Sequence, residues 1–362
     1  MENNLQAVSE AGTSIWLDDL SRDRLTNGSL VELISSSCVV GVTTNPSIFS
    51  AAIKGSTLYK SDILALKSQG EKVEKIVNAL TTSDVITACD LFSATFKESS
   101  HTDGRVSIEV DPFLAHDTEA TIAQGKALWE EINRPNLLIK VPATLEGLPA
   151  IQTLTANGIS VNVTLIFSVE RYRKVMDAYL SGLEDRISAN LPINDIHSVA
   201  SFFVSRIDSE IDKRLDLISP ASPLRGKSAI ANAVLAYEAY LEVMNSPRWR
   251  ELVTQGANTQ RPLWASTGVK DKSYDSTRYV IELIASNCVN TMPEATLNEV
   301  RSHGEVRGDT ITPAIPAAHA HFSSLHSAGI DFEDVVKFLE QDGVKKFADA
   351  WQELLANVSE VN

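Results

Sequence analysis

A lysine lies inside a short apolar segment of this chain. Residues 137–142 have the sequence Leu-Leu-Ile-Lys-Val-Pro, which predicts a short buried strand. Because side chains alternate along a strand, Leu138 and Lys140 face one side and the other apolar residues face the opposite side. Burial favours the neutral form of an amine, which is a nucleophile. The alternative that this segment leaves open is a lysine on an edge strand, facing solvent.

Polar side chains also end several other apolar segments. In 106–111 and 160–165 polar and apolar residues alternate, so each segment has one polar face. Six polar residues lie at or near the last positions of such segments: Asp18, Asn45, Glu109, Lys140, Asn162 and Thr164. In a parallel barrel these ends meet at one face, where a nucleophile, acids and hydrogen-bonding groups form a site for covalent and acid–base chemistry.

Each of these residues also has a purely structural interpretation. Those interpretations are an N-cap for Asp18, a turn residue before proline for Asn45, a salt bridge between Glu109 and Lys140, an ordinary β-branched strand residue for Thr164, and a solvated helix start for Arg206. A functional site is favoured because all of these interpretations would have to hold at once.

The elements that position these residues alternate along the chain. The predicted strands span 14–18, 38–44, 106–111, 137–141, 159–165, 199–204, 263–266 and 287–291. The predicted helices span 22–36, 83–96, 117–132, 168–186, 207–217, 230–244 and 331–358, with Ser83, Asp117 and Ser168 as N-caps. Eight strands separated mostly by helices indicate an α/β fold, the (β/α)8 TIM barrel with additional helices.

The rival fold is a doubly wound parallel sheet. It is disfavoured because no G-x-G-x-x-G motif follows the first predicted strand and no Walker-type loop is present. The 362 residues exceed the roughly 250 of a typical barrel, so insertions and terminal helices account for the excess. No linker or composition shift marks a second domain, and we expect a single domain over 1–362.

Composition limits the partners of the protein. A formal charge of −15, from 32 basic and 47 acidic side chains, argues against nucleic acids and anionic membranes. Three widely separated cysteines indicate buried thiols in a reducing cytoplasm. The first ten residues lack the features of a signal peptide, and no apolar run approaches the roughly 20 residues of a membrane span. We expect a cytoplasmic protein, and the sequence leaves open whether it is a monomer or a homodimer.

Six segments of the chain resemble transaldolases, in the order that the family has them. They are Trp16–Arg22, Gly41–Ser47, Val106–Asp111, Leu138–Thr144, Val161–Ser168 and Trp264–Gly268. The length and the Trp-Leu-Asp-Asp-Leu-Ser sequence are similar to the longer bacterial subgroup. The resemblance implies a (β/α)8 barrel of the Schiff-base aldolase type that acts in the pentose phosphate pathway.

The reaction that the resemblance implies is the transfer of a dihydroxyacetone unit from sedoheptulose 7-phosphate to glyceraldehyde 3-phosphate, giving erythrose 4-phosphate and fructose 6-phosphate. The resemblance implies that Lys140 forms the Schiff base and that Asp18 transfers the proton of the C4 hydroxyl. It also implies that Glu109 and Thr164 hold the water of carbinolamine formation. Asn45 and Asn162 are implied to form hydrogen bonds with the substrate. An iminium accepts the electrons released by cleavage, so we expect no metal and no organic cofactor.

The phosphate site is implied by a further segment. Residues 198–206, Ser-Val-Ala-Ser-Phe-Phe-Val-Ser-Arg, resemble the motif of the sixth strand in the family. This resemblance implies that Ser201 and Arg206 bind the phosphate and that Phe203 lines the pocket. A guanidinium suits such a site because it can donate two hydrogen bonds to one phosphate.

The chain departs from the family after the seventh predicted strand. An Ala-Ser-Phe-Arg pattern often supplies a second arginine there, whereas residues 265–270 are Ala-Ser-Thr-Gly-Val-Lys. Ser266 is a candidate for substrate binding, and Lys270 or Lys272 is the candidate for the missing positive charge.

Two other functions compete with the transaldolase hypothesis. A related Schiff-base aldolase would release free dihydroxyacetone, and an assay with and without an acceptor aldose would separate it from a transferase. A barrel that has lost its chemistry would serve as a scaffold. Such a protein is expected to lack the lysine or the acid, whereas Lys140 and Asp18 are both present.

Overall fold

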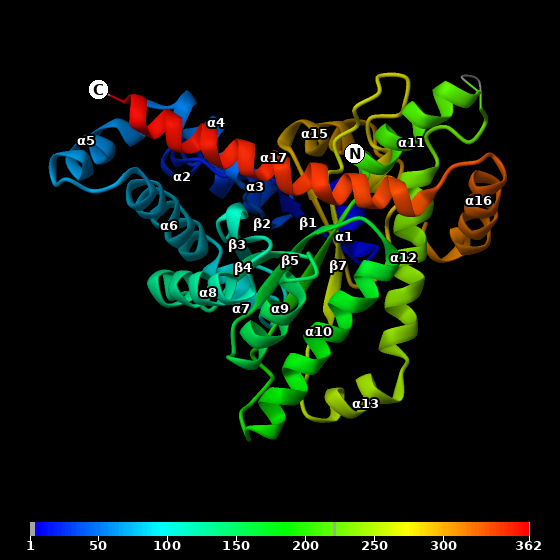
Figure 1. The fold of residues 1–362 in the computed structure, drawn as a ribbon, viewed down its shortest axis with the longest axis horizontal. Helices are drawn as coiled ribbons and strands as arrows, with labels where there is room; N and C mark the ends of the chain where they lie inside the picture. Colours follow the sequence, from blue (N-terminus) through cyan, green and yellow to red (C-terminus); the bar gives the residue numbers. More distant parts are fainter. Residues whose placement is uncertain (1–3, 220–221, 362) are drawn as a thin grey trace.

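A closed barrel of eight parallel strands forms the centre of the protein (Figure 1). The structure is a computed structural model that describes residues 4–219 and 222–361. Each strand pairs with the next, and β8 pairs with β1, which closes the barrel. The strands are β1 (Thr13–Leu17), β2 (Val39–Val42), β3 (Arg105–Glu109), β4 (Leu137–Pro142), β5 (Val161–Ile166), β6 (Ser198–Phe203), β7 (Gln260–Ala265) and β8 (Cys288–Met292). The predicted (β/α)8 TIM barrel is confirmed.

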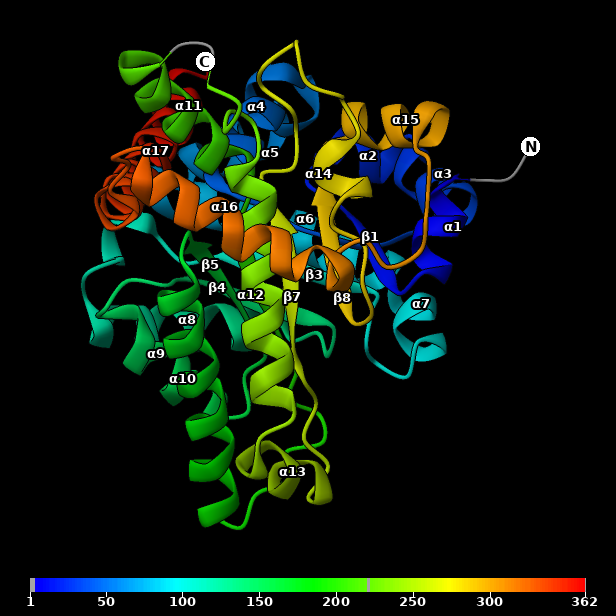
Figure 2. The same ribbon diagram turned by 90° about the vertical axis from the view of Figure 1, so that its right-hand side faces the viewer.

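Helices join the strands and cover the outside of the barrel (Figures 1 and 2). In the described ranges they are α1 (Asn4–Glu10), α2 (Arg22–Thr26), α3 (Ser29–Ser36), α4 (Pro46–Gly55), α5 (Lys60–Ser68), α6 (Val73–Leu91), α7 (Ser93–Glu98), α8 (Thr118–Ile132), α9 (Gly147–Ala156), α10 (Val169–Ser188), α11 (Ser205–Ile218), α12 (Ser228–Met244), α13 (Pro247–Thr254), α14 (Arg278–Ile281), α15 (Glu294–His303), α16 (Ile315–Ser327) and α17 (Phe332–Glu360). The predicted insertion near 230–244 is α12, which packs against α10 and α16.

The alternation of side chains along β4 places Lys140 inside the barrel. The outward residue Ile139 packs close to Gly125 of α8, where a Cβ atom would lie 3.5 Å from the Ile139 Cγ2 atom. In the parallel register, Lys140 pairs with Glu109 of β3 and with Asn162 of β5. Residues that are partners across neighbouring strands point to the same side of the sheet, so these three polar side chains face the interior together.

Several helix boundaries differ from the sequence-based predictions. The predicted helix 83–96 is the end of α6 followed by α7, and Ser83 lies within α6, so its assignment as an N-cap is wrong. The predicted helix 22–36 is interrupted at Gly28, which has a φ of 85°. The predicted caps Asp117 and Ser168 are confirmed, since their side chains accept hydrogen bonds from the backbone N–H groups three residues later.

The C-terminal helix α17 crosses the molecule on the side that holds α4 and α11 (Figure 1). It packs against α4, α6 and α11 and also contacts β5, so it connects elements that lie far apart in the sequence. Its N-cap is Asp331, whose side chain accepts a hydrogen bond from the backbone N–H of Asp334. This long helix therefore spans one end of the barrel and is held on both sides of it.

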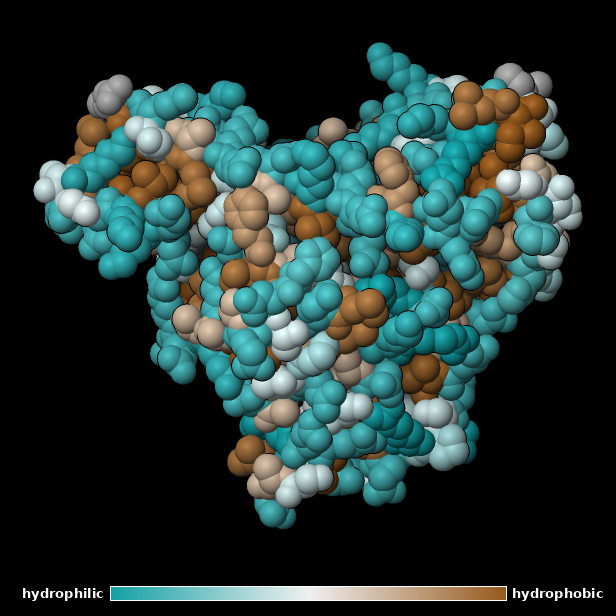
Figure 3. Space-filling model, in the orientation of Figure 1, coloured by the Kyte–Doolittle hydropathy of each residue, from teal (hydrophilic) through white to brown (hydrophobic). Residues whose placement is uncertain are grey.

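Hydrophobic residues on the face shown in Figure 3 form separate patches among hydrophilic ones. The most exposed large apolar side chain of the described residues is Leu217 at the end of α11. No helix within the described ranges combines the length and the apolar character needed to cross a membrane. The three cysteines are free thiols; Cys89 and Cys288 are buried and Cys38 is half-buried.

Candidate active site

A small cavity of about 90 Å³ lies inside the barrel at the carboxyl ends of the strands. The residues that line it are Asp18, Thr43, Asn45, Lys140, Thr164, Ser201, Phe203, Arg206, Ala265, Ser266, Thr291 and Phe347. They come from seven of the eight strands or the turns after them, and from α11 and α17. Eight of the residues predicted from the sequence therefore line one cavity, where folds of this class carry their chemistry.

Lys140 is held in a buried pair with Glu109. Its Nζ atom lies 3.5 Å from Oε2 of Glu109 and donates a hydrogen bond of 3.0 Å to the carbonyl oxygen of Thr44. Lys140 is only 4% exposed, and the barrel has no edge strand, so the solvent-facing alternative is wrong. The salt bridge between Glu109 and Lys140, which the sequence offered as a purely structural role, is present. It also holds the amine in the cavity.

The carboxyl group of Glu109 is unusual in its environment. Burial raises its pKa to about 7, although the nearby Lys140 ammonium lowers it. Among the residues that the structure describes, neither of its carboxyl oxygens has a hydrogen-bond partner. A buried acid that is ion-paired but accepts no hydrogen bond from the described residues, and whose pKa is near neutrality, is suited to exchange protons with a water or with a substrate hydroxyl beside the amine.

Asp18 follows β1 and reaches the cavity from the opposite part of the barrel. Burial raises its pKa, whereas Lys140 and a hydrogen bond from Thr43 lower it. The Thr43 hydroxyl donates to Oδ1 of Asp18 at 2.7 Å. Asp18 is not the N-cap of the helix that follows, because that cap is Ser21. Its carboxyl group therefore remains available to the cavity and is oriented by a neighbouring strand.

Ser201 lines the cavity, and Asn162 does not line it but is hydrogen-bonded to Ser201. The Asn162 side chain is fully buried, donates to the Ser107 hydroxyl at 2.9 Å and accepts a hydrogen bond of 2.7 Å from the Ser201 hydroxyl. These two bonds fix the orientation of the Asn162 amide. Thr164 lines the cavity beside them, and its buried hydroxyl has no hydrogen-bond partner in the described part of the chain.

Asn45 has both a structural role and a position in the site. Its Oδ1 atom accepts a hydrogen bond of 3.0 Å from the backbone N–H of Ile48, so it is the N-cap of α4. The following Pro46 occupies the first turn of that helix, as is common. The cap leaves the side-chain N–H₂ group free of this bond, and the residue lines the cavity.

Arg206 and Phe203 form the other side of the cavity. The Arg206 guanidinium lies over the Phe203 ring, with its Cζ atom 5.0 Å from the ring centroid. Burial lowers the pKa of Arg206, and Asp342 and Asp18 oppose that change. Its buried Nη1 atom has no hydrogen-bond partner within the described residues. A half-buried guanidinium with a free donor is suited to bind a phosphate.

After β7, the structure separates Ser266 from the two candidate lysines. Ser266 lines the cavity, has a φ of 56° and shares a hydrogen bond of 3.0 Å with Ser205. Lys270 is exposed and lines a different cavity, together with Asp208, Asp212 and other residues of α11. Lys272 is exposed and lines neither cavity. The cations that line the inner cavity are Lys140 and Arg206.

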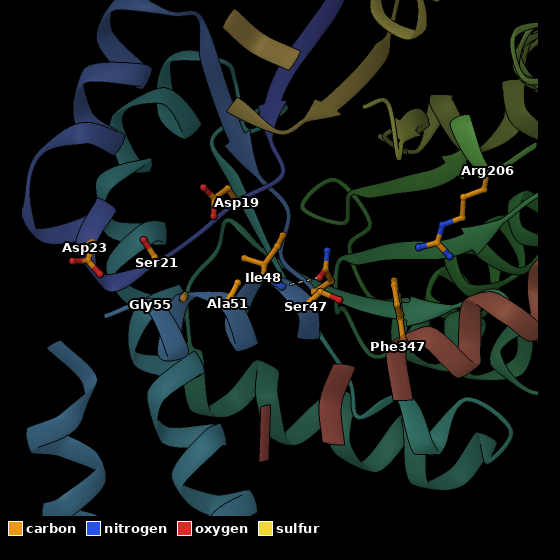
Figure 4. A pocket seen from close by; sticks show the side chains of 11 residues that line it. Asp19, Ser21, Asp23, Ser47, Ile48, Ala51, Gly55, Arg206 and Phe347 are labelled. Atoms are coloured by element: carbon orange, nitrogen blue, oxygen red, sulfur yellow. Dashed lines mark hydrogen bonds between the residues drawn. The ribbon is translucent and has the colours of Figure 1, made fainter. Parts of the chain in front are cut away.

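A larger outer cavity of about 580 Å³ opens beside the inner one (Figure 4). Its far wall carries Asp19, Ser21 and Asp23 of the segment after β1, whereas Arg206 and Phe347 lie on the side of the inner cavity (Figure 4). Asn45, Arg206 and Phe347 line both cavities. The two spaces therefore meet at these three side chains, which form the boundary between the amine and the open surface.

Three threonines and one phenylalanine of the site were not identified from the sequence. Thr43 and Thr291 belong to the hydrogen bonds around Asp18, and the Thr44 carbonyl accepts from Lys140. Phe347 comes from α17, about two hundred residues after the lysine. The sequence signal for the threonines was their place at the end of β2 and within β8, whereas Phe347 showed only the apolar spacing of an ordinary helix.

Comparisons with known proteins agree with this geometry. The sequence profile described as Transaldolase/Fructose-6-phosphate aldolase matches residues 15–358. A protein of Mycolicibacterium smegmatis named Transaldolase is 56% identical over 97% of this chain and 95% of its own length. A protein of Saccharopolyspora erythraea with the same name is 55% identical over 99% of this chain and 97% of its own length. The chain belongs to the transaldolase/fructose-6-phosphate aldolase family.

Proposed function

We propose that this protein is a transaldolase. It transfers a dihydroxyacetone unit from sedoheptulose 7-phosphate to glyceraldehyde 3-phosphate and forms erythrose 4-phosphate and fructose 6-phosphate. The single observation that carries the proposal is the buried Lys140 amine, 3.5 Å from a carboxyl oxygen of Glu109 and in one cavity with Asp18. Relatives of nearly equal length that are named Transaldolase support the same conclusion.

The first step is the attack of the neutral Lys140 amine on the ketone carbon of the donor. The carbinolamine that forms loses a water molecule and becomes an iminium. Glu109 can supply the proton that this water needs, because its pKa of about 7 leaves both protonation states populated near neutral pH. The Thr164 hydroxyl and the Glu109 carboxyl oxygens, which have no hydrogen-bond partner among the described residues, can form hydrogen bonds with this water.

The second step breaks the bond between C3 and C4 of the donor. Asp18, as a carboxylate, removes the proton of the C4 hydroxyl, and the bond electrons move into the iminium, which becomes an enamine. The first aldose leaves. The enamine carbon then attacks the carbonyl of the acceptor, whose oxygen takes the proton back from Asp18. Hydrolysis of the new iminium releases the ketose and restores Lys140.

The remaining residues orient the substrate in this proposal. Arg206 binds the phosphate through its free Nη1 donor, while Ser201, Ser266 and Phe203 line the adjoining wall. Asn45 and the buried Asn162 position the substrate hydroxyls. Lys270 is not assigned to this site, since it lines another cavity. We propose that the catalytic unit is a single domain over 1–362 and that it acts in the cytoplasm on sugar phosphates of the pentose phosphate pathway.

A fructose-6-phosphate aldolase is the second candidate, because the matching family profile includes both activities. The two reactions share every step up to the enamine. An aldolase then lets the enamine take up a proton and releases dihydroxyacetone, whereas a transaldolase retains it until an acceptor binds. The relatives at 55–56% identity carry only the transaldolase name, which favours transfer.

The experiment compares the consumption of fructose 6-phosphate with and without erythrose 4-phosphate. A transaldolase forms glyceraldehyde 3-phosphate and sedoheptulose 7-phosphate in equal amounts and turns over only when the acceptor is present. Lys140→Met is the matched control, because it keeps the length of the side chain without the amine. Dihydroxyacetone release without acceptor that continues at the rate of fructose 6-phosphate consumption with acceptor would establish the aldolase. No turnover under either condition would exclude both activities.

A further inference from the structure

The side chain of Phe347 occupies an unusual place for a residue of a C-terminal helix. Its ring centroid lies 5.5 Å from the Nζ atom of Lys140 and 6.5 Å from the centroid of the Phe203 ring. Phe347 is 5% exposed and lines both the inner and the outer cavity. In Figure 4 its ring extends from α17 into the space between Ser47 and Arg206. It is therefore part of the wall between the reactive amine and the open surface.

The position of this ring is fixed by the packing of α17. Gly343, one turn before Phe347, faces β5 and the segment after it. A Cβ atom at Gly343 would lie 3.1 Å from Leu165 and 3.4 Å from the ring of Phe167, which is closer than most such contacts. The glycine thus allows α17 to approach the barrel closely. Glu340 holds the same stretch of the helix through an ion pair of 3.2 Å with Arg171.

The chemistry gives this wall a consequence, which depends on the proposed function. Between the departure of the first aldose and the arrival of the second, the intermediate is an enamine on Lys140. If water protonates the enamine carbon, a C–H bond forms and the product is an iminium. A hydroxyl then adds to the iminium carbon and the C–N bond breaks. Overall, one water is consumed, and free dihydroxyacetone and the Lys140 amine are released.

Transfer uses the same carbon for a different bond. The enamine carbon forms a C–C bond with the acceptor aldehyde, and the proton goes from Asp18 to the aldehyde oxygen. The ratio of the two products therefore depends on how much water reaches the enamine before the acceptor does. Glu109 lies 3.5 Å from the amine and Thr164 lines the same cavity, so these two residues can hold the one water of iminium formation. Water from the outer cavity has to pass the boundary formed by Asn45, Arg206 and the ring of Phe347.

We propose that Phe347 is a specificity-determining residue that favours transfer over release of dihydroxyacetone, because its ring separates the enamine from the water of the outer cavity. It supplies no proton and forms no bond with the substrate. Its effect therefore falls on the ratio of the two products and not on the formation of the Schiff base.

The experiment measures two rates for each variant with fructose 6-phosphate as donor. One is the transfer rate with erythrose 4-phosphate, and the other is the rate of dihydroxyacetone release without acceptor. We expect Phe347→Ala to raise the ratio of release to transfer by about tenfold or more, which corresponds to about 1.4 kcal/mol between the two barriers. Phe347→Leu keeps most of the apolar volume and should give a smaller increase. Phe338→Ala, on the same helix with its side chain 42% exposed, is the matched control.

A second variant tests the same wall from another residue. Gly343→Ala should move α17 away from the barrel and raise the ratio while Phe347 itself is unchanged. An unchanged ratio in Phe347→Ala, even with slower transfer, would overturn the proposal. If that variant does not fold, an unchanged ratio in both Phe347→Leu and Gly343→Ala overturns it. A wild-type protein without transfer activity would overturn the proposed function and this proposal with it, whereas an active wild type with unresponsive variants overturns only this proposal.

Discussion

The hydrogen bond between Thr43 and Asp18 offers a direct test of the acid–base assignment. Thr43→Val removes the hydroxyl that donates to Oδ1 of Asp18 at 2.7 Å, while the side chain keeps a similar shape. The Thr43 oxygen also lies 2.6 Å from the hydroxyl oxygen of Thr291, which can donate to it. The variant therefore interrupts a chain of hydrogen bonds that ends at the Asp18 carboxylate and leaves the carboxylate itself in place.

The size of the effect follows from the charge on the acceptor. A hydrogen bond to an ionised group contributes about 1.5–3 kcal/mol, and the lower value applies because Asp18 is half-buried and water can replace the donor. Burial already raises the pKa of Asp18, and the bond from Thr43 opposes that rise, so its loss raises the pKa further. A loss of about 1.4 kcal/mol lowers the ionised fraction of Asp18 about tenfold at pH values below its pKa.

The assay is the pH dependence of kcat/KM for the transfer reaction. Asp18 acts as a carboxylate, so activity falls as the pH falls through its pKa. We expect the variant to lose activity at a higher pH than the wild type, with kcat/KM reduced about tenfold more on the acid side than on the plateau. Thr155→Val is the control, since this buried hydroxyl in α9 has no hydrogen-bond partner among the described residues. If kcat/KM of the wild type and of the variant falls at the same pH on the acid side, the assignment of Asp18 as the acid–base group is refuted.

Three further predictions concern other groups of the site. Asp18→Asn should still form a Schiff base that borohydride traps, but cleavage should slow by about a hundredfold or more; normal cleavage would contradict its role. Because burial raises the pKa of Glu109 from 4.5 to about 7, the folded protein retains a proton that the unfolded chain loses, so stability should fall as the pH rises through this window, by about 3 kcal/mol. In Glu109→Gln, the free energy of unfolding measured with urea should lose this part of its decrease with pH. An equally large decrease with pH in the variant and the wild type would contradict the prediction. Arg206→Ala should raise KM for phosphorylated donors by about tenfold to a hundredfold, whereas Lys270→Ala, in another cavity, should not.

The sequence predicted the barrel and much of its polar interior because both depend on local patterns. A period of two in β3, β4 and β5 decides which side chains face inward, and parallel pairing then brings Glu109, Lys140 and Asn162 together. The salt bridge was foreseen as a structural alternative, whereas Asn45 was predicted as a turn residue before proline and is the N-cap of α4. In the structure the salt bridge and the cap coexist with positions in or beside the cavity, so the two interpretations were not exclusive.

The errors arose where tertiary contacts override local signals. Asp84 resembles the acidic first turn of a helix that Ser83 would cap, but it is buried within α6 and bound to Arg22 and the hydroxyl of Tyr59. Phe347 could not be found because helical periodicity shows which face of α17 is buried and not what lies beneath it. Lys270 was a candidate by proximity in sequence to Ser266, and the chain after β7 carries it to another cavity.

The central claim is that the amine of Lys140 condenses with the donor ketone inside the barrel. Borohydride added together with fructose 6-phosphate reduces an iminium to a stable amine, and mass spectrometry of the digested protein locates the adduct. The account predicts loss of activity with one adduct, on the peptide that contains Lys140, and no adduct in Lys140→Met. An adduct on any other lysine, or full activity after treatment, would contradict it.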